Sequence, residues 1–174
     1  MFYILEMANN HQGSVDHARA IIDDFYRLKE KHNLNVGLKV QFRNLDTFIH
    51  EDFKNSDLKY VKRFNETRLE ENEFSKILRY ARKRGMKTVA TPFDNESLHL
   101  FDKLDVDILK IASCSSDDWP LLREIATMQR KIIMSTAGAE IEDLQKAYNL
   151  FKSHNRDFAF MHCAGDYPTP RDSA

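Results

Sequence analysis

Short apolar runs alternate along the chain with stretches whose apolar residues recur every three or four positions. The run Phe2 to Leu5 comes first, and Ser14 then precedes a stretch of helical spacing that contains Val15, Ala18 and Ile22. Short buried runs indicate strands of a parallel sheet, and the longer spacing indicates amphipathic helices that cover it. The same alternation predicts further strands over residues 36–40, 87–90, 107–111, 131–134 and 158–161, and further helices over residues 70–84, 95–104, 119–128 and 141–151.

Residues 44–68 break this alternation. The segment is polar and weakly periodic, and aromatic residues are scattered through it. We expect a long loop with some helix here. Loops of this length in a compact domain are more often functional than idle.

Polar residues gather where the predicted strands end. In a (β/α)₈ barrel this end of the strands carries the active site, whereas an open doubly wound sheet usually shows a glycine-rich phosphate-binding turn, which this chain lacks. The sequence therefore predicts an α/β fold of the (β/α)₈ TIM-barrel type, incomplete, with about six βα units. The polar strand-end residues are Glu6, Lys39, Gln41, Thr91, Lys110, Ser113, Ser135, Thr136 and His162.

Length and composition limit the class of protein. The chain has 174 residues, 42% of them hydrophobic, which is typical of one globular domain. Its net charge of -1 provides no overall field that would attract nucleic acid or an anionic membrane, and no apolar run is long enough to span a bilayer. Two cysteines and the lack of a leader sequence indicate a reduced, cytoplasmic protein.

Two lysines lie inside predicted strands, Lys39 in the second and Lys110 in the fourth. Desolvating an ammonium group costs several kcal/mol, so each must meet an anion. One interpretation pairs each lysine internally with a carboxylate such as Glu6 or Asp107. The interpretation that we favour is a shared anion site, because both lysines fall near the same rim and hydroxyl groups lie close to them in the sequence.

Other candidate residues have less specific patterns. Glu6 could serve as a counter-ion or as a base that takes a proton from water. His11 and His162 are expected to be hydrogen-bonded structural histidines, because no pair in the chain has a strong metal-binding spacing. Cys114 and Cys163 are expected to be small buried apolar residues.

Several short motifs, in order along the chain, resemble the N-acetylneuraminate (sialic acid) synthase family. Together they span nearly the whole chain, and their combination is specific although each alone is weak. The matching segments are residues 4–13 (ILEMANNHQG), 39–41 (KVQ), 91–93 (TPF), 110–113 (KIAS), 120–122 (PLL), 135–136 (ST), 162–163 (HC) and 167–170 (YPTP).

The resemblance implies a condensation of phosphoenolpyruvate with the open-chain aldehyde of an N-acylated amino sugar, releasing phosphate by C–O cleavage. It places Glu6 near the reacting water and metal, and Tyr167 against the sugar. It makes Lys110 both a substrate-binding and a catalytic residue. The family pattern implies that phosphoenolpyruvate is held by Lys39, Thr91, Lys110, Ser113 and Ser135, with Gln41 as a further substrate-binding residue.

Two departures from the family pattern stand out. The synthases carry a glutamate two residues after the serine that corresponds to Ser113, and this chain has Ser115 there. The family's divalent metal, Mn or Mg, is bound by histidines from the last part of the barrel, so the resemblance puts those ligands beyond residue 174. We therefore expect residues 1–174 to form one partial barrel domain that lacks the last strands and the small C-terminal antifreeze-like domain.

Three functions remain open from the sequence. The leading hypothesis is the phosphoenolpyruvate-dependent synthase, with possible homodimer formation or completion of the barrel by another chain. A second is a Schiff-base aldolase that uses Lys39 or Lys110. A third is a degenerate, non-catalytic module that binds a sugar, a phospho-ligand or a partner.

Overall fold

A single sheet of six parallel strands forms the centre of the protein. The computed structural model describes residues 1–166 and 169–173. Neighbouring strands pair in the order in which they occur along the chain. They are β1 (Phe2–Glu6), β2 (Asn35–Phe42), β3 (Lys87–Pro92), β4 (Ile108–Ile111), β5 (Lys131–Ser135) and β6 (Phe158–Met161).

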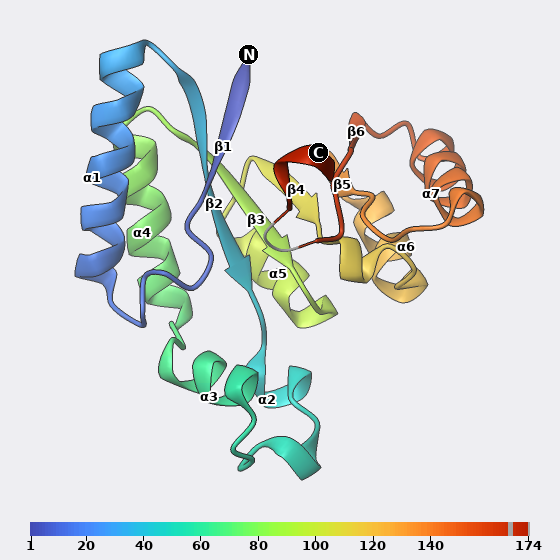
Figure 1. The fold of residues 1–174 in the computed structure, drawn as a ribbon, viewed down its shortest axis with the longest axis horizontal. Coiled ribbons are helices and arrows are strands. Elements are labelled where there is room, and N and C mark those ends of the chain that lie inside the picture. Colours follow the sequence, from blue (N-terminus) through green and yellow to red (C-terminus); the bar gives the residue numbers. More distant parts are fainter. Residues whose placement is uncertain (167–168, 174) are drawn as a thin grey trace.

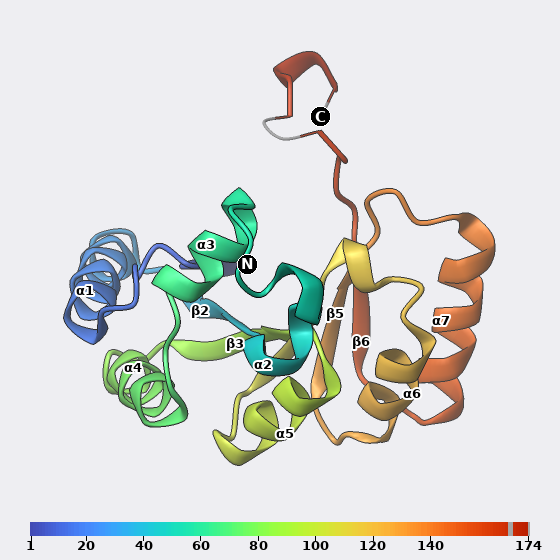
Figure 2. The same cartoon turned by 90° about the horizontal axis from the view of Figure 1, so that it is seen from below.

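Helices connect the strands and cover one face of the sheet. Figure 2 shows the sheet as an arc, with the connecting helices on its convex side. All connections return to the same side, so the sheet curls into a half-barrel, which is the expected incomplete form of a (β/α)₈ barrel. The connecting helices are α1 (Val15–His32), α4 (Glu71–Lys83), α5 (Asn95–Lys103), α6 (Trp119–Thr127) and α7 (Ile141–Ser153).

Strand β2 shows how the sequence separates the two faces of the sheet. Side chains alternate along a strand, and Val36, Leu38, Val40 and Phe42 are all buried in the main core against the helices. The opposite face of the same strand therefore carries Gly37, Lys39 and Gln41. A continuous core on one side and polar groups on the concave side follow from this alternation.

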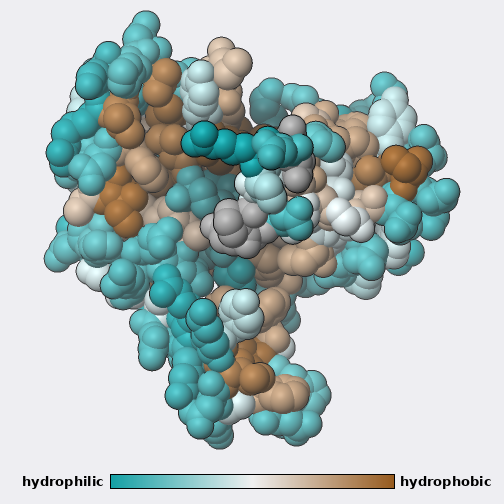
Figure 3. Space-filling view, in the orientation of Figure 1, coloured by the Kyte–Doolittle hydropathy of each residue, from teal (hydrophilic) through white to brown (hydrophobic). Residues whose placement is uncertain are grey.

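Residues 44–68 form a short helical excursion below the carboxyl end of β2 (Figure 1). It contains α2 (Leu45–Phe48), the 3₁₀ turn η1 (Glu51–Phe53) and α3 (Lys59–Glu66), as the expectation of a loop with some helix anticipated. Leu45, Ile49 and Val61 give it a small core of its own. Figure 3 shows apolar side chains at its surface, where Phe48, Phe53, Leu58 and Tyr60 are exposed.

The predicted strands and helices are all present, and the predicted boundaries agree with the structure to within two residues. Several side-chain expectations were wrong. Cys114 is exposed rather than buried, and Cys163 is only partly buried. On α7, Ile141 and Tyr148 are 74% and 42% exposed although both fit the apolar pattern. No helix within the described residues is both long enough and apolar enough to cross a membrane.

Leu109 tests how strongly the central strand supports the half-barrel. It is fully buried in β4, between Ala90 of β3 and Ile132 of β5. L109A should lower the free energy of unfolding by about 2–5 kcal/mol, because the cavity left behind adds to the lost burial. Urea denaturation would measure the change. L28A, on the exposed side of α1, is the matched control and should change stability by less than about 1 kcal/mol; equal effects would contradict the packing described.

Candidate active site

The first charged pair of the concave face joins β1 and β2. The register of these strands places Glu6 beside Lys39, and the Lys39 ammonium donates a hydrogen bond to Oε2 of Glu6. The other carboxylate oxygen, Oε1, accepts from the backbone N–H of Ala8 at 2.9 Å. The lysine side chain is 10% exposed and the glutamate side chain is 44% exposed. The ammonium group of the pair is therefore buried, whereas the carboxylate is accessible to solvent.

Lys110 has a different environment. It is 7% exposed, and its Nζ donates to the Ile111 carbonyl at 2.8 Å and to the Ser135 hydroxyl. No carboxylate of the described residues lies within ion-pairing distance of it, and Asp107 instead accepts from the backbone and side chain of Thr88. The interpretation that each lysine has its own acidic neighbour is thus right for Lys39 and wrong for Lys110.

The two ammonium groups act on each other electrostatically. Burial, with the positive charge of Lys39 as the second cause, lowers the pKa of Lys110 to about 8, while Glu6 opposes the shift more weakly. Both causes act against the charged form of the lysine, and a nearby anion would counter them. The concave face therefore favours an anion between Lys39 and Lys110.

Hydroxyl and amide groups complete a polar wall around these charges. The hydroxyl of Thr91, a residue that is 1% exposed, has no hydrogen-bond partner within the described part of the chain. Gln41 is the register partner of Thr91 across β2 and β3. Ser113 stands at the start of the 3₁₀ turn η2 (Ser113–Ser115), directly after β4. These groups can donate hydrogen bonds to oxygens of a phosphate or carboxylate.

One cavity of about 720 Å³ brings these predicted residues together. Its volume falls in the range of small-molecule sites. Tyr167 lies outside the described residues. The predicted site residues that line the cavity are Glu6, Lys39, Gln41, Thr91, Lys110, Ser113 and Ser135.

His11 fills a structural role, as expected from the sequence. It is 2% exposed, its Nδ1 accepts from the backbone N–H of Gly13 at 3.1 Å, and its ring packs edge-on against Phe74. Burial, with the charge of Arg63 as the second cause, lowers its pKa to about 4. His11 is therefore neutral at pH 7.

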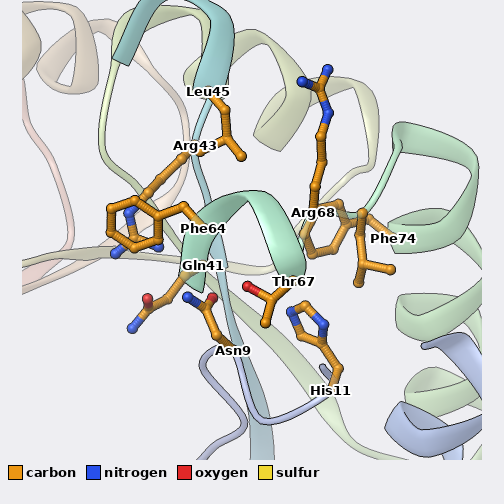
Figure 4. A pocket seen from close by; sticks show the side chains of 10 residues that line it. Asn9, His11, Gln41, Arg43, Leu45, Phe64, Thr67, Arg68 and Phe74 are labelled. Carbon is orange, nitrogen blue, oxygen red and sulfur yellow. The ribbon is translucent and has the colours of Figure 1, made fainter. Parts of the chain in front are cut away.

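Sequence reasoning missed Arg43, which lies two residues after Gln41, directly after the end of β2. A small hollow separates Arg43, Gln41 and Asn9 from the excursion, and Figure 4 shows the ends of these side chains near the ring of Phe64. The signal was present in the sequence, because Lys39, Gln41 and Arg43 follow the two-residue period of a strand.

The described residues do not by themselves fit a divalent metal. No three His, Cys, Asp or Glu side chains among them are grouped closely enough to hold an ion. Among the described residues that line the cavity, only Glu6 has a carboxylate.

The chain matches a model of the NeuB family over residues 31–174. Spore coat polysaccharide biosynthesis protein SpsE of Bacillus subtilis is 31% identical over 98% of the chain and 46% of its own length. N,N'-diacetyllegionaminic acid synthase of Campylobacter jejuni is 27% identical over 96% of the chain and 52% of its own length. The chain spans about half the length of these curated relatives.

Two crystal structures extend the comparison to three dimensions. A putative spore coat polysaccharide biosynthesis protein E from Chromobacterium violaceum superposes with a TM-score of 0.95 at 44% identity, covering 99% of the chain and 52% of that protein. The sialic acid synthetase of Leptospira borgpetersenii, in complex with citrate, gives 0.85 at 28% identity, covering 99% and 57%. The half-barrel therefore matches the corresponding half of larger proteins.

The lowered pKa of Lys110 makes stability depend on pH. Because the folded pKa is about 8, against 10.5 for an ordinary lysine, the unfolded state binds more protons between these values. The free energy of unfolding should therefore rise between pH 7.5 and pH 9.5, by about 1–2 kcal/mol. Chemical denaturation at the two pH values would measure it. K110M should lack this rise, whereas the exposed-lysine variant K131M should retain it; a rise preserved in K110M would refute the assignment.

Proposed function

Because the chain belongs to the NeuB family, we propose that it forms part of a synthase that condenses phosphoenolpyruvate with the open-chain aldehyde of an N-acylated amino sugar. The products would be a nonulosonic acid and phosphate. The observation that supports this reaction most directly is the pair of buried ammonium groups that line one cavity, of which only Lys39 is paired with a carboxylate among the described residues. Phosphoenolpyruvate is a small polyanion of the kind that such a pair attracts.

Lys39 and Lys110 are proposed to neutralise the phosphate and carboxylate groups of phosphoenolpyruvate. The hydroxyls of Thr91, Ser113 and Ser135 would donate to the remaining oxygens, and Thr91 has no competing partner among the described residues. In the reaction, C3 of phosphoenolpyruvate bonds to the aldehyde carbon, whose oxygen takes up a proton and becomes a hydroxyl, and water adds its oxygen to C2 and loses a proton. The bond between C2 and the oxygen of the phosphate group then breaks, phosphate leaves with the bonding electrons, and the new C2 hydroxyl loses its proton to give the ketone. Preorganised cations stabilise the charge that develops on it.

Glu6 is proposed to act on the water. Its carboxylate is held by Lys39 and by the backbone of Ala8, yet it stays 44% exposed toward the cavity. An arriving anion would compete for the Lys39 ammonium and free the carboxylate to form other hydrogen bonds. Glu6 could then accept the proton that the attacking water loses.

The remaining half of the barrel is part of this proposal. Among the described strands, β1 and β6 each have one unpaired edge. Further strands, from this polypeptide or another chain, would pair with these edges and supply the ligands of a divalent metal, Mn or Mg. Full activity, sugar contacts and oligomeric state, including a homodimer, would depend on that part.

A Schiff-base aldolase is the second candidate function. The lowered pKa of Lys110 favours it, because a lysine with a pKa of about 8 is partly neutral, and so nucleophilic, near neutral pH. Borohydride would trap the imine formed with a carbonyl substrate as a stable adduct on the lysine. The synthase mechanism forms no such adduct.

K110A in the intact protein should reduce phosphate release from phosphoenolpyruvate by at least about 100-fold, as expected when a preorganised cation is removed. The assay would measure inorganic phosphate with N-acetylmannosamine as acceptor and Mn²⁺ present. K131A is the matched control, because Lys131 lies at the amino end of β5, away from the carboxyl ends of the strands, and pairs with Asp157 at the surface.

Unchanged turnover in K110A would refute the role of this lysine. Calorimetric titration with phosphoenolpyruvate, with and without Mn²⁺, separates the synthase from the binding module. Binding without any phosphate release by the intact protein would favour the module, and a borohydride-trapped adduct would favour the aldolase.

A further inference from the structure

Cys163 contacts Ser135 at the wall of the main cavity. Ser135 is the last residue of β5 and pairs with Met161, the last residue of β6, and these two strands run side by side (Figure 2). Cys163 follows two residues later and is partly buried, with its Sγ 3.4 Å from the Ser135 hydroxyl oxygen. Ser135 and Met161 line the cavity, whereas Cys163 is not among the described residues that do. Any effect of Cys163 on a ligand would therefore pass through Ser135.

The Cys163 thiol has two possible acceptors but a single proton to donate. Its Sγ also lies 3.2 Å from the carbonyl oxygen of Met161. That carbonyl already accepts from the backbone N–H and from the hydroxyl of Thr136, both at 3.2 Å. A carbonyl oxygen has two lone pairs, so these two hydrogen bonds occupy both of them. The Ser135 oxygen is thus the acceptor that has room for the thiol proton.

Lys110 occupies the other acceptor position of Ser135. Its ammonium group donates to the Ser135 oxygen. Because the pKa of Lys110 is about 8, the group is mostly protonated at pH 7 and has no lone pair that could accept a hydrogen bond. A hydroxyl oxygen has two acceptor positions and one proton of its own. With both positions taken by Lys110 and Cys163, the Ser135 proton must point away from both, and the open direction is the cavity that Ser135 lines.

The cavity wall therefore presents buried hydroxyl groups that need an acceptor. Hydrogen bonds in a chain polarise one another, and each is stronger in a buried site than in water, so the two donors make the Ser135 hydroxyl a better donor. Thr91 supplies a second and independent indication. It is 1% exposed and lines the same cavity, and its hydroxyl has no partner within the described part of the chain. An oxyanion would supply acceptors for both hydroxyls.

We propose that Cys163 is a positioning residue: its thiol donates to Ser135 and thereby holds the Ser135 hydroxyl proton toward the cavity, where it donates to an oxygen of bound phosphoenolpyruvate. The inference rests on the proposed function, because that function supplies the ligand. Cys163 touches no substrate atom and takes no part in bond formation. Its contribution to binding exists only while Ser135 has a hydroxyl.

The test is a double-mutant cycle of C163A and S135A in the intact protein, read by calorimetric titration with phosphoenolpyruvate at pH 7. C163A should weaken binding about 2- to 10-fold, the range for a neutral hydrogen bond. S135A should weaken it about 10- to 100-fold, the range for a hydrogen bond to a charged group. The double variant should bind like S135A alone, because Cys163 then has no hydroxyl to orient. A residue that served only to pack the wall would give losses that add.

Two further variants serve as controls. C163S keeps a proton donor at this position and should bind within about 2-fold of the unmodified protein. C114A changes the other cysteine of the chain, which is exposed, and should leave binding unchanged. Thermal unfolding would verify that each variant folds. C163V, which fills the space with methyl groups, takes the place of C163A in the cycle if C163A does not fold.

Three results would overturn the inference: unchanged binding by C163A, losses that add in the double variant, or a C163S variant that binds as weakly as C163A. Absence of phosphoenolpyruvate binding by the unmodified protein would instead count against the proposed function. The same cycle would then be measured with inorganic phosphate, which offers the same kind of oxygen acceptor. Coupling between Cys163 and Ser135 in that titration would support the inference by itself, and a protein that bound neither anion would overturn both.

Discussion

The structure depends on one electrostatic constraint, the placement of two buried ammonium groups on the concave face of a parallel sheet, of which only one is paired with a carboxylate among the described residues. Glu6 neutralises Lys39, and Lys110 relies on a carbonyl and a hydroxyl. Removing an ammonium from water costs several kcal/mol, so the large core on the convex face must offset this cost. An anionic ligand would relieve the same cost on binding, which links the stability of the protein to its occupancy.

The excursion and the sheet contribute different parts of the candidate site. The strands set the spacing of the charged groups, because register and alternation leave little freedom at their carboxyl ends. The excursion adds Phe48 and Phe64, which hold Arg43. Rigid strands hold charged groups in fixed positions, and segments outside the sheet can add side chains around them.

The fold was largely predictable from the sequence, because each strand is a short apolar run and each helix has a clear apolar face. The convergence of the lysines on one cavity also followed from their positions near strand ends. The partner of Lys110 did not, because Asp107 and Ser135 are both near candidates and only the strand geometry selects the serine. Ile141 and Tyr148 fit a helical period, yet both are exposed. The period alone did not predict this, because it does not say how wide a face of the helix is buried.

Strand order has a consequence for how this protein is made. Each strand pairs with the one synthesised before it, so the sheet can grow by adding one βα unit at a time from the N-terminus. Lys39 is in place once β2 docks on β1, but Lys110 arrives two strands later. A nascent chain therefore meets the repulsion between like charges only after half of the sheet has formed, at a stage when the packed layers already present can tolerate it.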